Sequence, residues 1–514
     1  MIPCWTTFLL FTSAGCQPES DRNTDTTSES DTADDTPGFN ATDVVVLSGA
    51  LETVNWGDLV GSNVKIEGDL VVVDTFDLVR RGQIRLARQR LVIPTSLIDP
   101  NDADPDGQNF EGGNNVAKVI AAEKSNRSAA VIVDDGTMKE NIFPPKLLPG
   151  LGTDYPTLRV GSIVSEVTGT VDMVDGKPVL VPSEALRITP ASRPSCPKFD
   201  SGHTTVASFN VLNYFTTIDN GRNNARGADS PSELKRQEAK LVAAMVEMDA
   251  DVIGLMELEN NLAAEERLVK ALNQAIGKDV YVGCGRPDAF EDAPGGSDSI
   301  RVGIIYRTDR VESIGEPKLI RDPAFYRART PIAQTFQKLG GGKPFTVVVN
   351  HFKSKGGGND ADDANKDKGD GQAAYNAVRR TQSLAICRFI ESTKSSQDTD
   401  RILVLGDLNA YQQEDPIDAL RANGLIDLHE QNGVPSRDGV PEYSFVYYGQ
   451  CGSLDHAFAT PSLAADISGV ATWHINADEP RFVDYNEEFN PPALFEANPY
   501  RSSDHDPVLI GIGD

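Results

Sequence analysis

Basic residues are scarce in this sequence relative to acidic ones, and long apolar runs are missing. Lys and Arg number 48 against 76 Asp and Glu, which gives a formal net charge of −28. An acidic surface repels anions over a Debye length of about 10 Å, so a polyanionic substrate would need cations to mediate its binding. No apolar run approaches the ~20 residues of a membrane-spanning helix, so the sequence predicts no such span.

Cysteine pairs with metal-ligand spacing are missing as well. The 6 cysteines include no Cys-x-x-Cys pair, which argues against a zinc site. The composition, with 39% hydrophobic and 24% charged residues, excludes collagen, a coiled coil and wholesale disorder. The 514 residues exceed the about 100–200 residues of a typical domain, so we expect two or more globular domains.

The first residues are similar to a bacterial lipoprotein signal. A short apolar stretch, Trp5 to Phe11, precedes small residues and then Cys16. The resemblance implies that residues 1–15 are a signal peptide and that Cys16 is lipidated, so that only this lipid holds the chain on a membrane. An ordinary signal peptide or a misplaced start codon is the alternative. Either kind of signal predicts export, to the outer membrane or cell surface or into the medium.

Residues 16–43 are rich in Ser, Thr, Asp and Glu and contain almost nothing apolar. Such a segment cannot bury enough surface to offset the entropy of ordering it. We predict a disordered acidic tether, with a functional acidic tail as the alternative.

Four cysteines remain beyond the tether: Cys196, Cys284, Cys387 and Cys451. Export favours disulfide pairing among them, and three connectivities are open. Four buried free thiols are the alternative.

Short β-rich runs separated by Gly, Asn and Asp predict a small antiparallel β domain over residues 44–190, and a Pro-containing linker follows at 191–200. The order of the runs suggests a partly open barrel of the OB type, a fold that binds oligonucleotides in many proteins. A packing or spacer domain without a ligand is the alternative.

Within this domain, Asp102 to Gly107 has the carboxylate spacing of the front of a calcium loop. The twelfth position is Gly113, where such a loop needs Glu. A solvated acidic turn is therefore favoured, and an irregular Ca²⁺ site is the alternative.

Residues 201–514 alternate strand and helix patterns, which predicts an α/β domain with polar residues at strand ends around one crevice. Helices are predicted over Ser232 to Met248 and over Ala373 to Ser392. The first of these helices is expected to begin at Ser232. The predicted strands are 204–211, 252–256, 300–306, 344–350, 401–405, 454–459 and 507–512.

Polar motifs collect at the ends of these predicted strands. Each motif alone is weak, because a single Glu or His near a strand end is more often structural than catalytic. Six of them in one order point to a shared site. The motifs are Ser208 to Asn213, Gly254 to Glu257, Asn350 to Lys355, Leu405 to Asn409, Ser453 to His456 and Ser502 to Pro507.

With these motifs the sequence resembles the endonuclease/exonuclease/phosphatase superfamily, which has the DNase I-like fold, and within it the exported bacterial nucleases with an OB-like domain ahead of the catalytic one. Asp298 to Val302 leading to Tyr306, and Asp370 to Gln372 leading to Asn376 and Arg379, also look like that subfamily. The resemblance implies a two-sheet α/β sandwich with helices outside and an active site at one end of the sheets.

The resemblance implies a role for each polar residue of the site. Glu257 would be the main carboxylate ligand of a Mg²⁺ or Mn²⁺ ion, with Asn210 and Asp504 nearby, since hard cations prefer oxygen ligands. Asp407 would align or deprotonate the attacking water, and Asn409 would orient it.

Two histidines complete the implied site. His505 and His351 would contact the scissile phosphate, stabilising its charge or protonating the leaving oxygen. Asp455 would hold His505 in the required tautomer and keep it cationic. A strand-end acid near a turn is the alternative reading of Asp455.

No Ser or Cys nucleophile with a base is apparent, so the residues favour metal-assisted attack of water on a phosphodiester. We expect a nuclease acting on DNA, with RNA as a second candidate, little sequence specificity and a monomeric enzyme. Lys353, Lys355 and Arg379 are candidates for contacts with the phosphate backbone. The fold also serves sphingomyelinases and inositol polyphosphate phosphatases, so a metal-dependent phosphoesterase acting on lipid head groups or small phosphate esters is the alternative.

Two further expectations concern parts around the site. The acidic, glycine-containing loop Gly356 to Gln372 is expected to be solvated, with Ca²⁺ binding as the alternative. Because all catalytic candidates follow the β domain, we predict that a chain starting near Ser195 still cleaves, with a higher KM on long substrates.

Overall fold

The computed structural model describes residues 44–102, 113–200, 202–287, 290–395, 399–433 and 439–513. The predicted signal and tether, with Cys16, lie outside the described residues, as does nearly all of the predicted calcium-loop segment 102–107. Across the described ranges, no helix combines the length and the apolar character that crossing a membrane requires.

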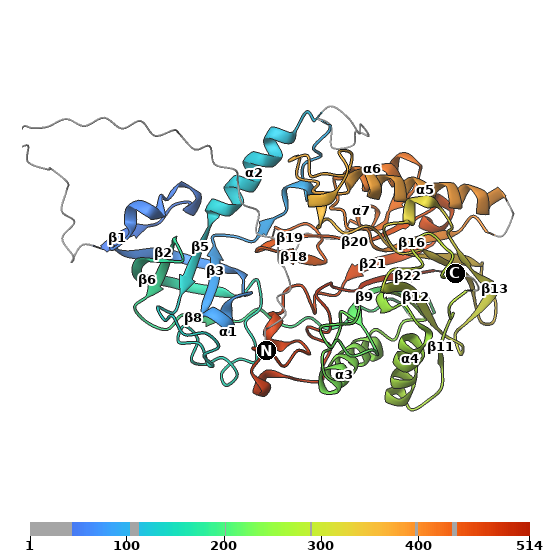
Figure 1. Cartoon of the computed structure of the whole chain (residues 1–514), viewed down its shortest axis with the longest axis horizontal. Helices are drawn as coiled ribbons and strands as arrows, with labels where there is room; N and C mark the ends of the chain where they lie inside the picture. Colours follow the sequence, from blue (N-terminus) through green and yellow to red (C-terminus); the bar gives the residue numbers. More distant parts are fainter. Residues whose placement is uncertain are drawn as a thin grey trace, which may run out of the picture.

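Two six-stranded β-sheets form the centre of the C-terminal part (Figure 1). Their strand orders are β11-β12-β10-β9-β22-β21 and β13-β14-β15-β16-β20-β17. The first contains β9 (Thr204–Tyr214), β10 (Val252–Glu259), β11 (Tyr281–Gly283), β12 (Ile300–Arg307), β21 (Ile467–Thr472) and β22 (Val508–Ile512). The second contains β13 (Val311–Leu319), β14 (Ile332–Lys338), β15 (Phe345–His351), β16 (Ile402–Asp407), β17 (Ile426–Asp427) and β20 (Asp455–Ala459).

The two sheets pack face to face over a shared apolar core. Val206 and Val302 of the first sheet join Val347 and Leu405 of the second in one buried cluster. Gly254 on β10 lies at a close approach of the sheets, because a Cβ added there would lie 2.7 Å from Leu405 Cδ1. The predicted α/β sandwich is confirmed.

Helices cover the outer faces of both sheets (Figure 1). α3 (Pro231–Met248) and α4 (Leu262–Ile276) pack on the first sheet, where Met245 and Leu268 join a buried cluster with Phe209. α5 (Asn376–Ser395) and α6 (Asp415–Ala422) pack on the second sheet, where Ile386 and Ile417 join another. Among the described residues of this part, the remaining α-helices are the short α7 (Leu428–Gln431) and α8 (Pro461–Ala464).

Two helix starts differ from the prediction. α3 is capped by Ser230, whose Oγ accepts the Glu233 N–H at 3.1 Å, rather than by Ser232. This cap lets Pro231 occupy the first helical position, where its missing N–H costs nothing. α5 begins at Asn376 rather than Ala373, because positive φ angles at Ala373 and Tyr375 are incompatible with a helix.

The N-terminal part is a β barrel. Its sheet has the order β1-β2-β3-β5-β7-β6-β8, and the additional β2–β6 pairing closes a ring. The strands are β1 (Val44–Leu47), β2 (Asn63–Asp74), β3 (Gln83–Ala87), β5 (Ala130–Asp134), β6 (Ile163–Val174), β7 (Lys177–Pro182) and β8 (Arg187–Thr189). The expected purely antiparallel pairing is wrong, since β1 is parallel to β2 and β5 is parallel to β7. The assignment to the OB type stays a prediction.

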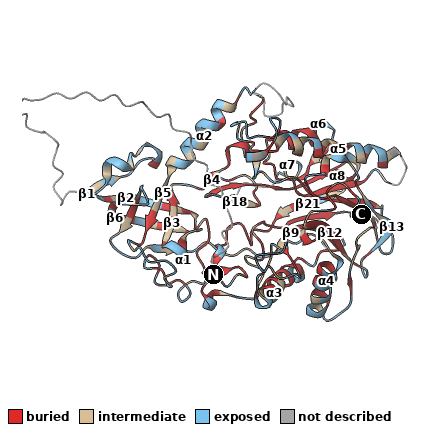
Figure 2. Cartoon of the chain, in the orientation of Figure 1, coloured by how far each residue is buried: buried red, intermediate tan, exposed pale blue. Residues whose placement is uncertain are grey.

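The N-terminal part was predicted as an all-β domain, but it also contains two α-helices, α1 (Leu78–Arg81) and α2 (Val116–Ala129). A further short strand is β4 (Leu91–Val92). α2 is largely exposed, whereas buried residues concentrate in the barrel and the two sheets (Figure 2). β4 leaves the barrel and joins a small sheet, β18-β19-β4, with β18 (Phe445–Tyr447) and β19 (Gln450–Gly452) of the C-terminal part.

The expectation that the cysteines form disulfides is wrong. The four cysteines beyond the tether all lie in described ranges, and all are free thiols. They pack into four different apolar clusters, which keeps them apart. Burial raises the pKa of Cys196 and of Cys387 to about 11, which keeps both thiols protonated.

Candidate active site

Polar side chains from four strands lie in one place. They are Asn210 on β9, Glu257 on β10, His351 at the end of β15 and Asp407 at the end of β16. Strand register explains part of this proximity, because His351 lies opposite Asp407 across the β15–β16 pair. Asp455 lies opposite Asp407 on the other side, across the β16–β20 pair. Sheet pairing therefore brings these predicted residues together.

Glu257 lies at a break in its strand. The register of β10 shifts between Met256 and Leu258, and Glu257 has a φ of 67° in the left-handed region. A bulge of this kind re-aims one side chain out of the alternation of the strand. Asn409, two residues beyond β16, also has a positive φ, of 49°. Non-glycine residues rarely adopt this conformation, and such residues cluster at functional sites.

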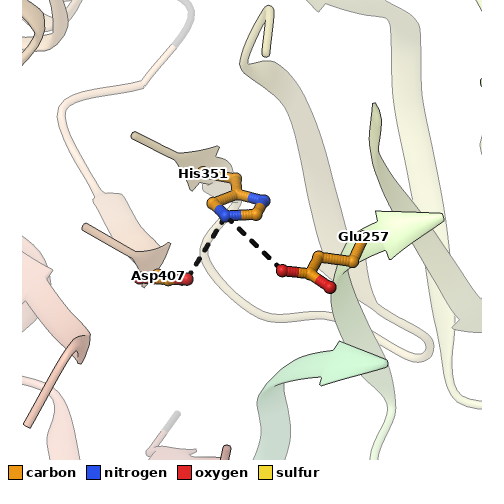
Figure 3. A group of neighbouring side chains, drawn as sticks. All are labelled: Glu257, His351 and Asp407. Carbon is orange, nitrogen blue, oxygen red and sulfur yellow. Dashed lines mark ion pairs between the residues drawn. The ribbon is translucent and has the colours of Figure 1, made fainter. Parts of the chain in front are cut away.

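Two carboxylates and an imidazole form a compact group (Figure 3). His351 Nε2 lies 3.3 Å from Asp407 Oδ2 and 3.9 Å from Glu257 Oε1. The Asn210 amide lies between the two acids, with Nδ2 at 3.3 Å from Glu257 Oε1 and 3.5 Å from Asp407 Oδ2. The Asn213 N–H donates to the other Glu257 oxygen at 2.9 Å.

Negative charge is concentrated at this group. Burial raises the pKa of Glu257, and the nearby Asp504 and Asp407 carboxylates raise it further. Burial alone would also raise the pKa of Asp407, but His505 and His351 hold it below its ordinary value. A second positive charge between the acids would relieve their repulsion.

The group is therefore suited to a metal ion. The ligand atoms of Glu257, His351 and Asp407 lie within 4.8 Å of one another. Buried carboxylate oxygens with unbalanced charge are what a hard divalent cation requires. Asp504, which the resemblance places among the ligands, is half-buried and acts on Glu257 electrostatically, but it lies outside this compact group.

His505 is held by an acid on one side and faces the site on the other. Its Nδ1 lies 2.7 Å from Asp455 Oδ2, and its Nε2 lies 4.0 Å from Asp407 Oδ2. The Ser444 hydroxyl donates to the same Asp455 oxygen at 2.7 Å. Burial alone would lower the pKa of His505, but Asp455 and Asp407 raise it well above its ordinary value. The imidazole is therefore cationic, as the resemblance implies.

His351 differs from His505 in charge. Burial, aided by the neighbouring Arg329 cation, lowers the pKa of His351 to about 4. At neutral pH the imidazole is therefore uncharged. Its Nδ1 is buried and finds no hydrogen-bond partner among the described residues. A phosphate at this position would meet a neutral N–H donor rather than a second imidazolium.

Arg329 is a site residue that the sequence reasoning missed. It precedes β14, is only 6% exposed, and its Nε has no partner among the described residues. Burial lowers its pKa, while Asp298, Glu257 and Asp407 act in the opposite direction. One Arg in an irregular segment has no pattern that marks it, so only the folded chain reveals it.

Asn409 is tied to the backbone in this structure. Its N–H donates to Asp407 Oδ1 at 2.8 Å, and its Nδ2 donates to the Phe352 carbonyl at 3.2 Å. The first contact fixes the orientation of the Asp407 carboxylate. The side-chain oxygen of Asn409 remains the group that can orient a water.

The three predicted phosphate contacts differ in their surroundings. Arg379 is fully buried and donates to the carbonyls of Gln372 and Ala374 at 2.7 Å, so it supports the loop; we correct its predicted contact with substrate. Lys355 Nζ donates to the buried Glu414 carboxylate at 2.7 Å, and this carboxylate neutralises the charge of the lysine. Lys353 is half-buried, and burial lowers its pKa to about 8. It is the cation of the three that is left for a phosphate.

The acidic loop after β15 uses its carboxylates on its own backbone. Asp367 Oδ1 accepts the Gly369 N–H at 2.8 Å, and Asp370 Oδ1 accepts the Gln372 N–H at 2.9 Å. Among the described residues, no group of metal-ligating side chains is found in this loop. The solvated loop is the reading that these contacts favour.

A buried ion network joins the barrel to the loops that carry His505. Arg90, in the connection between β3 and β4, pairs with Asp478, and Arg159 pairs with Glu479. The Tyr443 hydroxyl accepts a hydrogen bond from Arg90 Nη1 at 2.5 Å and donates one to Asp478 at 2.9 Å. Burial alone would raise the pKa of Asp478, but the two arginines hold it below its ordinary value.

The same network continues to the active site. Tyr443 directly precedes Ser444, whose hydroxyl donates to Asp455. The Tyr443 ring stacks on the His474 ring, with 4.1 Å between the ring centroids. His474 Nδ1 lies 2.9 Å from Oδ2 of Asp506, the residue that follows His505 in the chain. The barrel thus helps to position the His505–Asp455 pair.

Asp478→Asn should destabilise the protein by about 3–5 kcal/mol, because it leaves the buried Arg90 without its carboxylate partner. The measurement is the free energy of unfolding in urea. Asp175→Asn, which removes a surface partner of Arg81 at 3.6 Å, is the matched control and should cost less than about 1 kcal/mol. Equal losses of unfolding free energy in the two variants would show that the buried network stabilises the protein no more than a surface ion pair does.

These contacts also revise the prediction for a shortened chain. A chain starting near Ser195 would keep Asp478 and Glu479 but lose Arg90 and Arg159. We now expect it to be unstable rather than active.

The sequence model of the Endonuclease/Exonuclease/phosphatase family matches residues 207–505, which is more than half of the chain. The chain belongs to this family. The match contains all the catalytic and metal-ligating positions discussed above. The family's members generally depend on divalent metals, which agrees with the acidic group at Glu257 and Asp407. The chain is therefore a phosphoesterase of this family.

Several solved structures resemble this member of the family. A family protein from Bacteroides thetaiotaomicron is 18% identical over 62% of this chain and 100% of that one, with a TM-score of 0.39. A mannosyl-6-phosphatase from the same species is 17% identical over 60% and 98%, with a TM-score of 0.38. TDP2 of D. rerio, complexed with a single-strand DNA product, is 15% identical over 61% and 100%, with a TM-score of 0.37. No curated protein matches the chain.

Proposed function

We propose that the protein is an exported, metal-dependent nuclease that hydrolyses phosphodiester bonds of DNA, and of RNA as a second substrate, with little sequence specificity. The observation that carries the proposal is the pairing of a cationic His505 with the acidic group across the site. His505 Nε2 lies 4.0 Å from Asp407 Oδ2, and Asp407 lies 3.3 Å from His351. The acidic side of the site, with Asp407, can thus bind a cation and a water, while His505 on the other side contacts a phosphate oxygen.

Glu257 of the compact group would be the main ligand of Mg²⁺ or Mn²⁺, with Asn210 and Asp504 nearby. His351 and Asp407 of that group act on the phosphate and the water. When bound, this ion supplies a positive charge that neutralises phosphate oxygens and offsets the local negative charge of Glu257, Asp407 and Asp504. Ca²⁺ is a further candidate for the acidic segments. His351 and Arg329 add a neutral donor and a buried cation near the same oxygens.

The residues of the chain carry the proton transfers. Asp407 aligns the attacking water or takes its proton, with Asn409 fixing the carboxylate. As the water oxygen bonds to phosphorus, the bond to the leaving oxygen breaks. The His505 imidazolium gives its proton to that oxygen, and Asp455 stabilises the cation before transfer.

Other parts of the proposal rest on the sequence. The signal at 1–15, the lipid at Cys16 and the tether at 16–43 support export to the outer membrane or cell surface, and we propose a monomer. The ring β2-β3-β5-β7-β6 of the barrel supports an OB-type domain over 44–190, since that fold is a five-stranded Greek-key barrel.

A substrate panel tests the proposal. Single-stranded DNA, plasmid DNA, RNA, sphingomyelin and a sugar phosphate monoester are incubated with the full chain and Mg²⁺. We expect cleavage of the DNA substrates at rates well above those of the monoester and the lipid. Turnover confined to sphingomyelin or the monoester would support the alternative, a phosphoesterase of lipid head groups or small esters.

A further inference from the structure

A ladder of aromatic rings leads from His505 to the protein surface. The Phe445 ring centroid lies 4.7 Å from that of His505, and Tyr447 lies 6.4 Å beyond Phe445 in a stacked arrangement. Tyr448 meets Tyr447 edge-on at 4.6 Å. His505 is 6% exposed, whereas Tyr447 is 51% and Tyr448 62% exposed. The ladder thus connects the buried site with two rings in solvent.

The backbone holds Tyr448 outward at a cost. Tyr448 and Gly449 form the two-residue connection between β18 and β19, with φ angles of 48° and 81°. Hairpins of this kind favour Asn-Gly or Asp-Gly, because both central residues have positive φ. An aromatic residue gains nothing from this conformation, so its exposed ring calls for another explanation.

The hairpin is fixed in place between the two parts of the chain. A Cβ added at Gly449 would lie 3.3 Å from the Val73 carbonyl of the barrel. Gln450 Nε2 donates to Glu123 on α2 at 3.0 Å, and Asn126 on α2 donates back to Gln450 at 2.5 Å. The rings are therefore presented by a rigid support beside α2.

The flanking helix has the charge that a polyanion requires. α2 carries Lys118, Lys124 and Arg127, and its single acid, Glu123, pairs with Arg127 at 2.7 Å, which leaves the two lysines for phosphates. This positive segment stands out in a chain whose net charge is −28. Phosphates along α2 and planar groups on the tyrosines would be bound at the same time.

We propose that Tyr447 and Tyr448 form a stacking platform for unpaired bases of the strand whose phosphodiester lies at His505. This inference rests on the proposed nuclease function. Every base has a π-face, so stacking on tyrosine binds a strand without reading its sequence. Bases in a duplex are already stacked on their neighbours, so the platform makes single strands the preferred substrate.

The test compares two substrates that differ only in their bases. An oligothymidylate and an oligomer of abasic deoxyribose phosphates of equal length are cleaved by the full chain, in Mg²⁺. The double variant Tyr447→Ala/Tyr448→Ala should raise KM for oligothymidylate about tenfold and leave KM for the abasic oligomer and both kcat values unchanged. Phe76→Ala, which removes a ring of the barrel that is 54% exposed, is the matched control and should change neither KM.

The outcomes separate the platform from the function. An unchanged KM for oligothymidylate overturns the platform while the nuclease function stands. An equal rise in KM for both oligomers also overturns it, because the rings would then bind the sugar-phosphate chain. If the wild-type chain cleaves plasmid DNA but neither oligomer, the platform is overturned and the nuclease function stands; if it cleaves no nucleic acid, both fail.

Discussion

Asp407→Asn is expected to lower kcat on a phosphodiester by on the order of 10²-fold or more, the range of general acid–base catalysis. The substitution keeps the shape of the side chain and the oxygen that accepts the Asn409 N–H at 2.8 Å. It removes the negative charge that lies 3.3 Å from His351 Nε2 and 4.0 Å from His505 Nε2. Substrate binding should remain, because the phosphate contacts of the other residues are unaffected.

The measurement is single-turnover cleavage of an oligonucleotide, with circular dichroism as the check on folding. Asp251→Asn is the matched control, because Asp251 is also a buried acid, at the opposite end of β10, where it accepts the Thr205 N–H at 2.8 Å. Its kcat should equal that of the wild type. Wild-type turnover by Asp407→Asn would show that Asp407 has no part in the chemistry.

The strand-end motifs could be predicted from sequence because sheet pairing is regular. Once β15 and β16 are parallel neighbours, His351 and Asp407 at their ends lie side by side. The His505–Asp455 pair also follows from the resemblance, and the structure places the two groups 2.7 Å apart. What the sequence does not contain is the bulge that gives Glu257 its φ of 67°, because this depends on the partners of β10 on both sides.

Residues that act through distant contacts were beyond prediction. Arg329 and Ser444 have no motif, and each reaches the site only through the fold. A basic residue near a strand end was expected to bind phosphate, but burial and local partners decide this. Arg379 and Lys355 are occupied by backbone carbonyls and by Glu414.

The relation between the barrel and the catalytic part could not be predicted either. The sequence shows a linker and suggests separable domains, but β4 pairs with β19 and Arg90 pairs with Asp478. Both contacts join residues more than 350 positions apart. Such pairings have no local signal, since neither residue type nor spacing marks a partner so distant.

Removal of divalent cations is expected to abolish phosphodiester cleavage, and this is the second large effect. Glu257 and Asp407 are buried close together, and Asp504 adds to the negative charge that raises the pKa of Glu257. A phosphodiester brought to such a group without a cation would be repelled. His505 and Arg329 together cannot neutralise three carboxylates and a phosphate.

The most direct measurement is therefore the cleavage rate of one oligonucleotide by the full chain in EDTA, followed by a titration with Mg²⁺ or Mn²⁺. The account predicts background rates in EDTA, full recovery on titration, and a higher metal concentration for half-recovery in Glu257→Gln. Circular dichroism before and after EDTA shows that the chain stays folded. Full activity in EDTA, or an identical titration curve for Glu257→Gln, would contradict a metal-dependent site at Glu257.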